Sequence, residues 1–413
     1  MPGLQTVSFR LCQEPKAIHG LPWSVMQLVL SLPTLKDLAV DRHRFAPKLL
    51  AEEELTLDYC APLTSFRYTL SDYRWWRKQT FPLEKQALLL VLNKTHTSLE
   101  RLTLIAELAP LDEICNTLEW PNLRELCLRG ERGTIGNPPL PLVSMFANML
   151  RLQRLELKLG LREGVDPQPF WPLGYVAEWP WADLRHLTLS YPLVNDQIYS
   201  SLPPTLESLA LRYTPHMVHA ERYDADVLWN WPLIKSSVML QILRRCRCRR
   251  LSSLQLEYRE DEADAELMQC VGASFPALTT FKLLRYRAAN DAEAGPLDAL
   301  LRMLGAHLCL QTIRLHIDHV DTSTPFYRGG YRDYACDIPR LESCLASTQS
   351  LADSLAGASG SSLETITLWA PHSYFPYSWF WENFTVVRDE TTGVGVRALS
   401  TVKTRKPSAP ASR

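Results

Sequence analysis

The sequence predicts an α/β solenoid, in which short parallel strands form an inner sheet and helices cover its outer side. The first observation is the motif Leu-x-x-Leu-x-Leu at Leu123–Leu128, which returns along most of the chain. The second is the spacing of its copies, because nine of the eleven gaps lie between 22 and 36 residues. Twelve copies near the length of roughly 20–29 residues indicate a leucine-rich-repeat horseshoe.

Six copies are strict, and six replace one or more of the later leucines by Phe, Val, Ile or Tyr. A solenoid grows by stacking units on their neighbours, so 413 residues need not form two or three separate globules. The copies begin at Leu4, Leu35, Leu63, Leu99, Leu123, Leu152, Leu184, Leu206, Leu251, Leu278, Leu310 and Leu363.

Helical segments precede several copies of the motif. Residues 82–93 place Ala87, Leu88, Val91 and Leu92 on one face of a helix. Pro22 suits the first turn of a helix over residues 23–32, and Pro33 ends it. Similar segments at 142–150 and 296–304 give a repeating unit of helix, short turn and strand.

Two gaps are too long for one repeat, at 45 and 53 residues, and hold insertions at 213–234 and 318–337. Insertions in repeats map to loops, which often bind partners. Residues 131–141 and 167–180 are loops by composition. We therefore predict a solenoid of about twelve irregular repeats over 1–370, an aromatic C-terminal cap over 371–400 and a disordered tail over 401–413.

Composition narrows the class of protein. Apolar residues make up 46% of the chain, and the net charge of −1 argues against nucleic acid or an anionic membrane as a partner. No apolar run is long enough to span a bilayer, and we expect no secretory leader. Ten Cys residues without C-x-x-C pairs predict reduced thiols in the cytoplasm or nucleus. Four of them, Cys115, Cys127, Cys309 and Cys344, are expected to be small buried hydrophobes.

Strand alternation predicts a polar binding surface. If the second and third motif leucines point into the core, the residues before, between and after them face the opposite side. The later repeats place more neutral side chains there, although Glu257 is also predicted to face solvent. The candidate protein-binding residues on this concave face are Arg101, Glu125, Arg129, Arg154, Glu156, Lys158, His186 and Arg212.

Catalytic motifs are missing from the sequence: it contains no G-x-S-x-G, glycine-rich phosphate loop or H-E-x-x-H. We therefore expect that the protein is not an enzyme and binds no cofactor. His316 and His319 have metal-ligand spacing, but their ordinary interpretation is polar residues at the end of a strand. Cys246 and Cys248 lie among five Arg, which either lower a thiol pKa or complement a helix C-terminus before the acidic run 257–266.

The phrases Trp-Pro-Asn-Leu-Arg-Glu-Leu-Cys-Leu at 120–128 and Trp-Ala-Asp-Leu-Arg-His-Leu-Thr-Leu at 181–189 carry a family resemblance. The chain resembles the leucine-rich-repeat region of fungal F-box proteins, of the ribonuclease-inhibitor-like class. This resemblance implies that the repeats hold a protein substrate while an F-box docks on a cullin-based ubiquitin ligase. The first repeat begins at Leu4, so an F-box would lie upstream of Met1.

The Asn that often ends such repeats is mostly missing from this chain, which predicts a less regular ladder of backbone hydrogen bonds. The alternative function is a ribonuclease-inhibitor-like or signalling regulator, which blocks a partner's surface without docking on a ligase.

Overall fold

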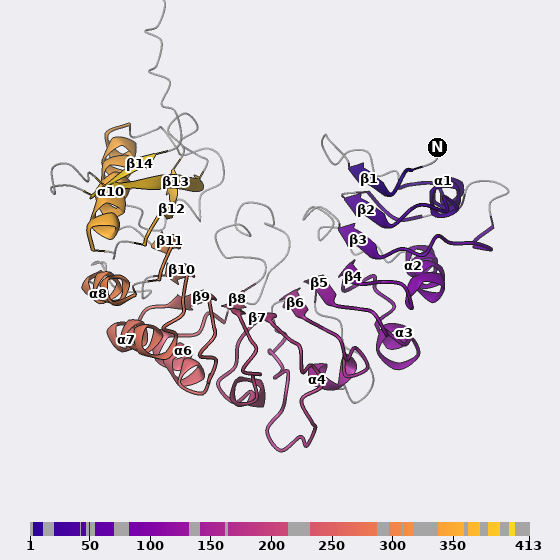
Figure 1. The fold of residues 1–413 in the computed structure, drawn as a ribbon, viewed down its shortest axis with the longest axis horizontal. Coiled ribbons are helices and arrows are strands. Elements are labelled where there is room, and N and C mark those ends of the chain that lie inside the picture. The colour runs from indigo at the N-terminus through magenta and orange to yellow at the C-terminus, as the bar shows by residue number, and fades with distance from the viewer. Residues whose placement is uncertain are drawn as a thin grey trace, which may run out of the picture. The chain divides into compact units, whose positions relative to one another are not determined.

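The computed structural model divides into two compact units, Met1–Leu233 and Ile234–Arg413. Both units combine strands and helices, and their strands follow one another in chain order (Figure 1). The structure describes residues 3–10, 20–41, 43–46, 49, 54–69, 82–131, 141–161, 164–213, 232–286, 297–307, 309–317, 338–358, 362–371, 379–388 and 396–400.

The first unit contains eight parallel strands among its described residues, each paired with the next along the chain. Each strand begins at the third residue of a predicted motif copy, so these eight predicted strands are confirmed. The strands are β1 (Thr6–Arg10), β2 (Asp37–Asp41), β3 (Ser65–Thr69), β4 (Arg101–Ile105), β5 (Glu125–Glu131), β6 (Arg154–Gly160), β7 (His186–Ser190) and β8 (Ser208–Arg212).

Parallel strands need a crossover to return to the same sheet edge. Five of the seven connections between these strands contain a helical segment among their described residues. Within the first unit, α1–α4 lie on one side of β1–β6 (Figure 1). The helices predicted at 23–32 and 82–93 are confirmed, whereas the one at 142–150 ends early, at Met145. The segments are α1 (Trp23–Leu30), α2 (Pro82–Thr95), α3 (Leu111–Asn116), α4 (Leu142–Met145) and the 3₁₀ helix η2 (Gln197–Ser200).

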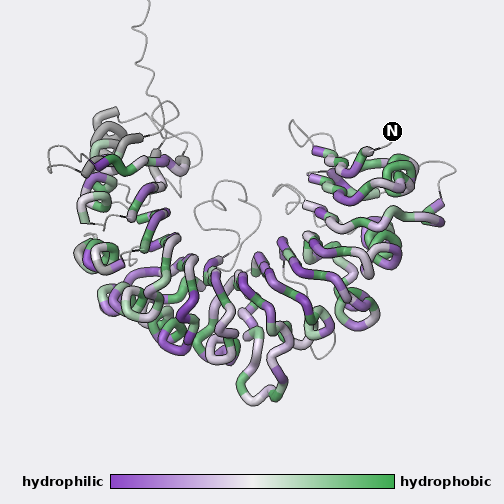
Figure 2. The backbone as a smooth tube through the Cα atoms, viewed as in Figure 1, coloured by the Kyte–Doolittle hydropathy of each residue, from purple (hydrophilic) through white to green (hydrophobic). Residues whose placement is uncertain are grey.

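The core of the first unit is built from rows of motif leucines. The second motif leucine of one repeat pairs in register with that of the next, as in Leu102, Leu126 and Leu155. These side chains are at most 1% exposed, whereas their strand neighbours are half-buried or exposed. Figure 2 shows the alternation as interleaved hydrophilic and hydrophobic segments. The buried rows explain why a Leu-x-Leu pattern selects strands here.

Two buried tryptophans are hydrogen-bonded to the helical segments that precede them in the chain. The indole N–H of Trp120 donates to the carbonyl of Ile114 at 2.9 Å. Trp181 does the same to the carbonyl of Phe146 at 3.0 Å. Both side chains are 1% exposed, so the hydrogen bonds satisfy polar groups that would otherwise be costly to bury.

Within each unit, backbone hydrogen bonds join every parallel strand to the next, although the repeat asparagine is mostly missing. At each step one carbonyl accepts two N–H groups from the next repeat, as Glu100 O does from Arg124 and Glu125. The same pattern runs through the described strands of both units. Hydroxyl groups add side-chain hydrogen bonds between several repeats: Ser98 Oγ, for example, donates to Leu63 O at 2.8 Å. The predicted irregularity is therefore wrong for these strands.

The second unit pairs β9, β10, β11 and β12 in parallel and β12, β13 and β14 in antiparallel. The first four are predicted motif copies, whereas the two antiparallel strands lie in the predicted cap. Its strands are β9 (Ser253–Arg259), β10 (Thr280–Tyr286), β11 (Thr312–Ile317), β12 (Thr365–Pro371), β13 (Trp379–Arg388) and β14 (Val396–Ser400). Its helices are α6 (Ser236–Leu243), α7 (Asp264–Ser274), α8 (Asp298–Ala306) and α10 (Ile338–Ala358).

The α/β class with a mostly parallel sheet is therefore confirmed. The loop predicted at 167–180 is free of helix and strand, with a turn at Leu173 and Gly174. Residues 214–231 and 318–337, which make up most of the two insertions, lie outside the described residues, as do Cys344's side chain and the tail 401–413. No described helix combines the length and apolar character that crossing a bilayer requires.

Candidate protein-binding surface

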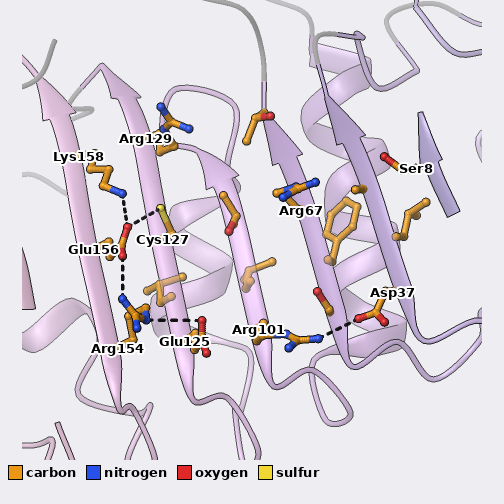
Figure 3. A pocket seen from close by; sticks show the side chains of 18 of the residues that line it. Ser8, Asp37, Arg67, Arg101, Glu125, Cys127, Arg129, Arg154, Glu156 and Lys158 are labelled. Atoms are coloured by element: carbon orange, nitrogen blue, oxygen red, sulfur yellow. Dashed lines mark hydrogen bonds and ion pairs between the residues drawn. The ribbon is translucent and has the colours of Figure 1, made fainter. Parts of the chain in front are cut away.

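A hollow of about 610 Å³ lies on the first unit's sheet, over β1–β6 (Figure 3). We call it the β1–β6 hollow. Most of its side chains occupy the third, fifth or seventh motif position, because strand alternation brings these positions to the same side of the sheet. It is lined by Thr6, Ser8, Asp37, Leu38, Ala39, Ser65, Phe66, Arg67, Thr69, Arg101, Leu102, Thr103, Glu125, Leu126, Cys127, Arg129, Arg154, Glu156 and Lys158.

Six of the eight predicted binding residues line the β1–β6 hollow. His186 and Arg212 do not: they lie on β7 and β8, beyond the last lining strand. The six residues that the structure brings together are Arg101, Glu125, Arg129, Arg154, Glu156 and Lys158.

Sequence reasoning overlooked the contribution of β1–β3. Asp37 and Arg67 line the hollow from the looser copies of the motif, at its third and fifth positions. The same rule that selected residues on β4–β6 would have found them. A motif copy with Phe or Tyr alternates sides in the same way as a strict copy, so the rule holds for β1–β3 as well.

Ion pairs cross neighbouring strands of the hollow. Arg154 on β6 reaches Glu125 on β5 at 3.7 Å and Glu156 on its own strand at 3.2 Å. Lys158 also pairs with Glu156 (Figure 3). Glu156 thus receives two cations, and the chain of charges fixes the side-chain geometry of β5 and β6.

A second group of ion pairs lies toward β2 and β3. Arg101 on β4 pairs with Asp37 on β2 at 3.0 Å, spanning the strand between them (Figure 3). Arg67 pairs with Asp41 at 3.0 Å, and Asp41 also lies 3.5 Å from Arg10. The side chains of these cations are 48–66% exposed, so each pair contributes little stability and can exchange for a partner's charge.

Titration of the groups in the hollow follows their burial and neighbours. Burial raises the pKa of the Cys127 thiol to about 11, despite the opposing charge of Lys158. At neutral pH the thiol is protonated and donates to Glu156, with 3.7 Å between Sγ and Oε2. Burial, reinforced by Arg154, lowers the pKa of His186. Cys127 is therefore a poor nucleophile, and His186 adds no positive charge at neutral pH.

Glu156 has a pKa set by competing effects. Burial by itself raises the pKa of this carboxyl. The hydrogen bonds and charges of Lys158 and Arg154 outweigh burial and hold the pKa below its ordinary value of 4.5. Ionised Glu156 is consequently a stabilising group in the folded chain.

Removing the Glu156 charge should flatten the acid dependence of stability. Because the folded-state pKa is lowered, the ionised form stabilises the fold above about pH 4.5 and loses this effect as the pH falls through the lowered value. We expect E156Q to melt below wild type at neutral pH, and the gap to narrow from about pH 5 to about pH 3. Thermal unfolding across this range measures it. The variant E119Q, at an exposed site, should melt at the same temperature as wild type at each pH. A difference in melting temperature between E156Q and wild type that stays constant with pH would contradict the lowered pKa of Glu156.

Three further sequence expectations need correction. Glu257 is 0% exposed, not solvent-facing, because the Tyr286 hydroxyl of the next strand donates to it at 2.9 Å. Cys309 is exposed, whereas Cys115 is buried as expected. Cys127 is only partly buried.

The Cys246–Cys248 segment is no reactive-thiol site. Both thiols are buried, and burial raises the pKa of Cys248 to about 11 and that of Cys246 still further. The segment follows the end of α6, and Arg244 pairs with Glu266 of the acidic run. The segment therefore lies at the end of a helix, as one of the two interpretations predicts. The other interpretation, a lowered thiol pKa, is wrong.

Metal-binding geometry is absent from the part of the chain that the structure describes. No group of three or more His, Cys, Asp or Glu side chains there is placed to hold an ion. His316 is 3% exposed, and its sequence neighbour His319 lies outside the described residues. Comparison with family models and with curated proteins finds no match to this chain. The arrangement of the β1–β6 hollow, which offers ion pairs and hydrogen bonds, is therefore the basis for a functional assignment.

Proposed function

We propose that the chain is a leucine-rich-repeat solenoid of the horseshoe class that binds a protein partner without catalysis. The observation that carries this proposal is the β1–β6 hollow, which collects charged side chains from successive repeats on one sheet face. The repeat core fixes the backbone beneath them, so the surface is organised before it meets a partner. Solenoids use extended surfaces of this kind for binding.

Within this class, the substrate-recognition region of an F-box-type ubiquitin ligase adaptor is the function we favour. The support is the sequence resemblance of the repeat phrases at 120–128 and 181–189. The chain would work in the cytoplasm or nucleus, where ligase substrates and reduced thiols occur. In this assignment the repeats hold the substrate, and an F-box docks on the ligase.

Charge reversal tests whether the hollow binds. The variant R129E/R154E/K158E should weaken the affinity for a captured partner by more than about tenfold, because three attractive charges become repulsive. Partners are captured by proximity labelling, and their dissociation constants are then measured with purified proteins. The matched control K85E/R124E/R151E makes the same charge change outside the hollow and should keep wild-type affinity.

Circular dichroism and melting of the triple variant separate lost binding from lost folding. The far-ultraviolet spectrum should stay unchanged, because Arg129, Arg154 and Lys158 are outside the leucine core. Undiminished binding by a folded variant would move the site to the inserted loops at 213–234 or 318–337.

The ligase assignment has a separate test. A purified cullin adaptor should bind the chain only when an upstream F-box is present. If the extended chain fails to bind the adaptor but the hollow still binds its partner, the protein is a regulator that blocks a partner's surface instead.

A further inference from the structure

The β1–β6 hollow differs in charge from the chain around it. The whole chain has a net charge of −1. Of the charged side chains that line the hollow, five are cations and three are carboxylates, a balance of +2. The cations are Arg67, Arg101, Arg129, Arg154 and Lys158, and the carboxylates are Asp37, Glu125 and Glu156.

Every carboxylate of the hollow already has a cation. Asp37 pairs with Arg101, and Glu125 and Glu156 pair with Arg154. A basic partner would have to compete with these internal pairs for each contact. The hollow is therefore poorly suited to a cationic ligand.

Arg129 is the cation of the hollow that a partner's anion would stabilise most. It is exposed and makes no ion pair with any residue that the structure describes. Its register partner on β6 is Lys158, so two like charges lie opposite each other on neighbouring strands. Two opposed like charges are destabilising unless an anion lies nearby. Glu156 supplies an anion to Lys158, with which it forms an ion pair, but it forms none with Arg129.

The dimensions of the hollow fit an extended chain segment. Adjacent strands are about 4.8 Å apart, so the path from β2 to β6 covers about 19 Å. An extended peptide advances about 3.3 Å per residue, so about six residues span this distance. The cations occur on four of these five strands, from Arg67 on β3 to Lys158 on β6.

We propose that the β1–β6 hollow accepts an extended acidic segment of a protein partner, with one of its carboxylates facing Arg129. Glu156 then acts as an internal counter-ion that a partner's carboxylate partly replaces at Lys158 and Arg154. This inference rests on the proposed function and adds the chemistry of the partner.

Peptide binding tests the charge preference. The probes are fluorescent short peptides of alternating Glu and Ala, of alternating Lys and Ala, and of phosphoserine and Ala, with an oligothymidylate as a nucleic-acid probe. We expect the Glu peptide to bind, with an affinity that falls as salt rises, and the Lys peptide not to bind. Tighter binding of the phosphoserine peptide would identify phosphate as the preferred anion source. Preference for the Lys peptide or for oligothymidylate would overturn the proposal.

Single substitutions then locate the binding. R129Q should lower the affinity for the Glu peptide by about three- to tenfold, whereas R124Q, outside the hollow, should leave this affinity unchanged. E156Q should strengthen binding by about threefold, because it removes the competing carboxylate. Equal effects of R129Q and R124Q, or weaker binding by a folded E156Q, would contradict the assignment.

A steric variant separates this inference from the proposed function. T103W fills the hollow from β4 without changing charge. If T103W blocks the captured protein partner while no acidic peptide binds, the surface functions but its partner is not acidic. If T103W and the charge variants both leave the partner bound, the hollow is not the binding site and both proposals fail.

Discussion

Replacing Arg285 by methionine should lower the free energy of unfolding by about 3–5 kcal/mol. Arg285 lies on β10 in the second unit and its side chain is 6% exposed. Its guanidinium is 2.5 Å from Glu260 and 3.1 Å from Asp264, and both carboxylates are also largely buried. Asp264 accepts a further hydrogen bond from Tyr258 at 2.8 Å. Methionine keeps the volume but leaves two buried carboxylates without a counter-ion.

A matched variant identifies the cause of this loss. Chemical denaturation at neutral pH measures the free energy of unfolding of R285M, with R244M as the control. Arg244 pairs with Glu266 where both side chains are more than half exposed, so R244M should cost less than about 1 kcal/mol. Equal losses for R285M and R244M would contradict the assignment of the loss to the buried ion pairs of Arg285.

The strand positions were predictable from the sequence because the signal is local and repeated. In all twelve copies the strand begins at the third motif residue, including the loose copies at Leu4 and Leu278. Two inward leucines separated by one residue fix which side of a strand is buried, and a one-residue slip would expose both. The leucine pattern also ends where the parallel pairing ends, at β12.

Side-chain burial within a strand was only partly predictable. Glu257 has the motif position of a solvent-facing residue, yet Tyr286 covers it from the neighbouring strand. Alternation reports the side on which a residue lies, but not what packs over that side. Exposed Cys309 is a similar case, because apolar neighbours in sequence do not require neighbours in space.

The extent of the hollow also depended on three-dimensional packing. The motif places polar residues on one face of all the strands, so it selects His186 and Arg212 together with Arg154. It does not reveal that the hollow ends at β6. Nor does it reveal that Glu156 takes both cations of its strand and leaves Arg129 unpaired among the described residues. These pairings depend on rotamers and distances across strands.

The second large effect is expected at Asp196, which precedes η2 and is 0% exposed. Its carboxylate accepts backbone N–H groups from Phe170 at 2.6 Å, Trp171 at 3.0 Å and Ile198 at 3.1 Å. One buried side chain thus joins the loop after β6 to the next repeat. D196A leaves three donors without this acceptor and should destabilise the first unit by about 3–5 kcal/mol.

The position of the two oxygens predicts a graded series. Oδ1 holds two of the donors and Oδ2 holds one, so D196N can keep the first pair and should cost about 1–3 kcal/mol. D166A, at an exposed site in the same loop, should be nearly neutral. Denaturation followed by tryptophan fluorescence measures all three, since Trp171 stacks on Trp179 with ring centroids 6.1 Å apart. Equal losses for D196A and D196N would mean that the negative charge, not the number of accepted hydrogen bonds, holds the loop in place.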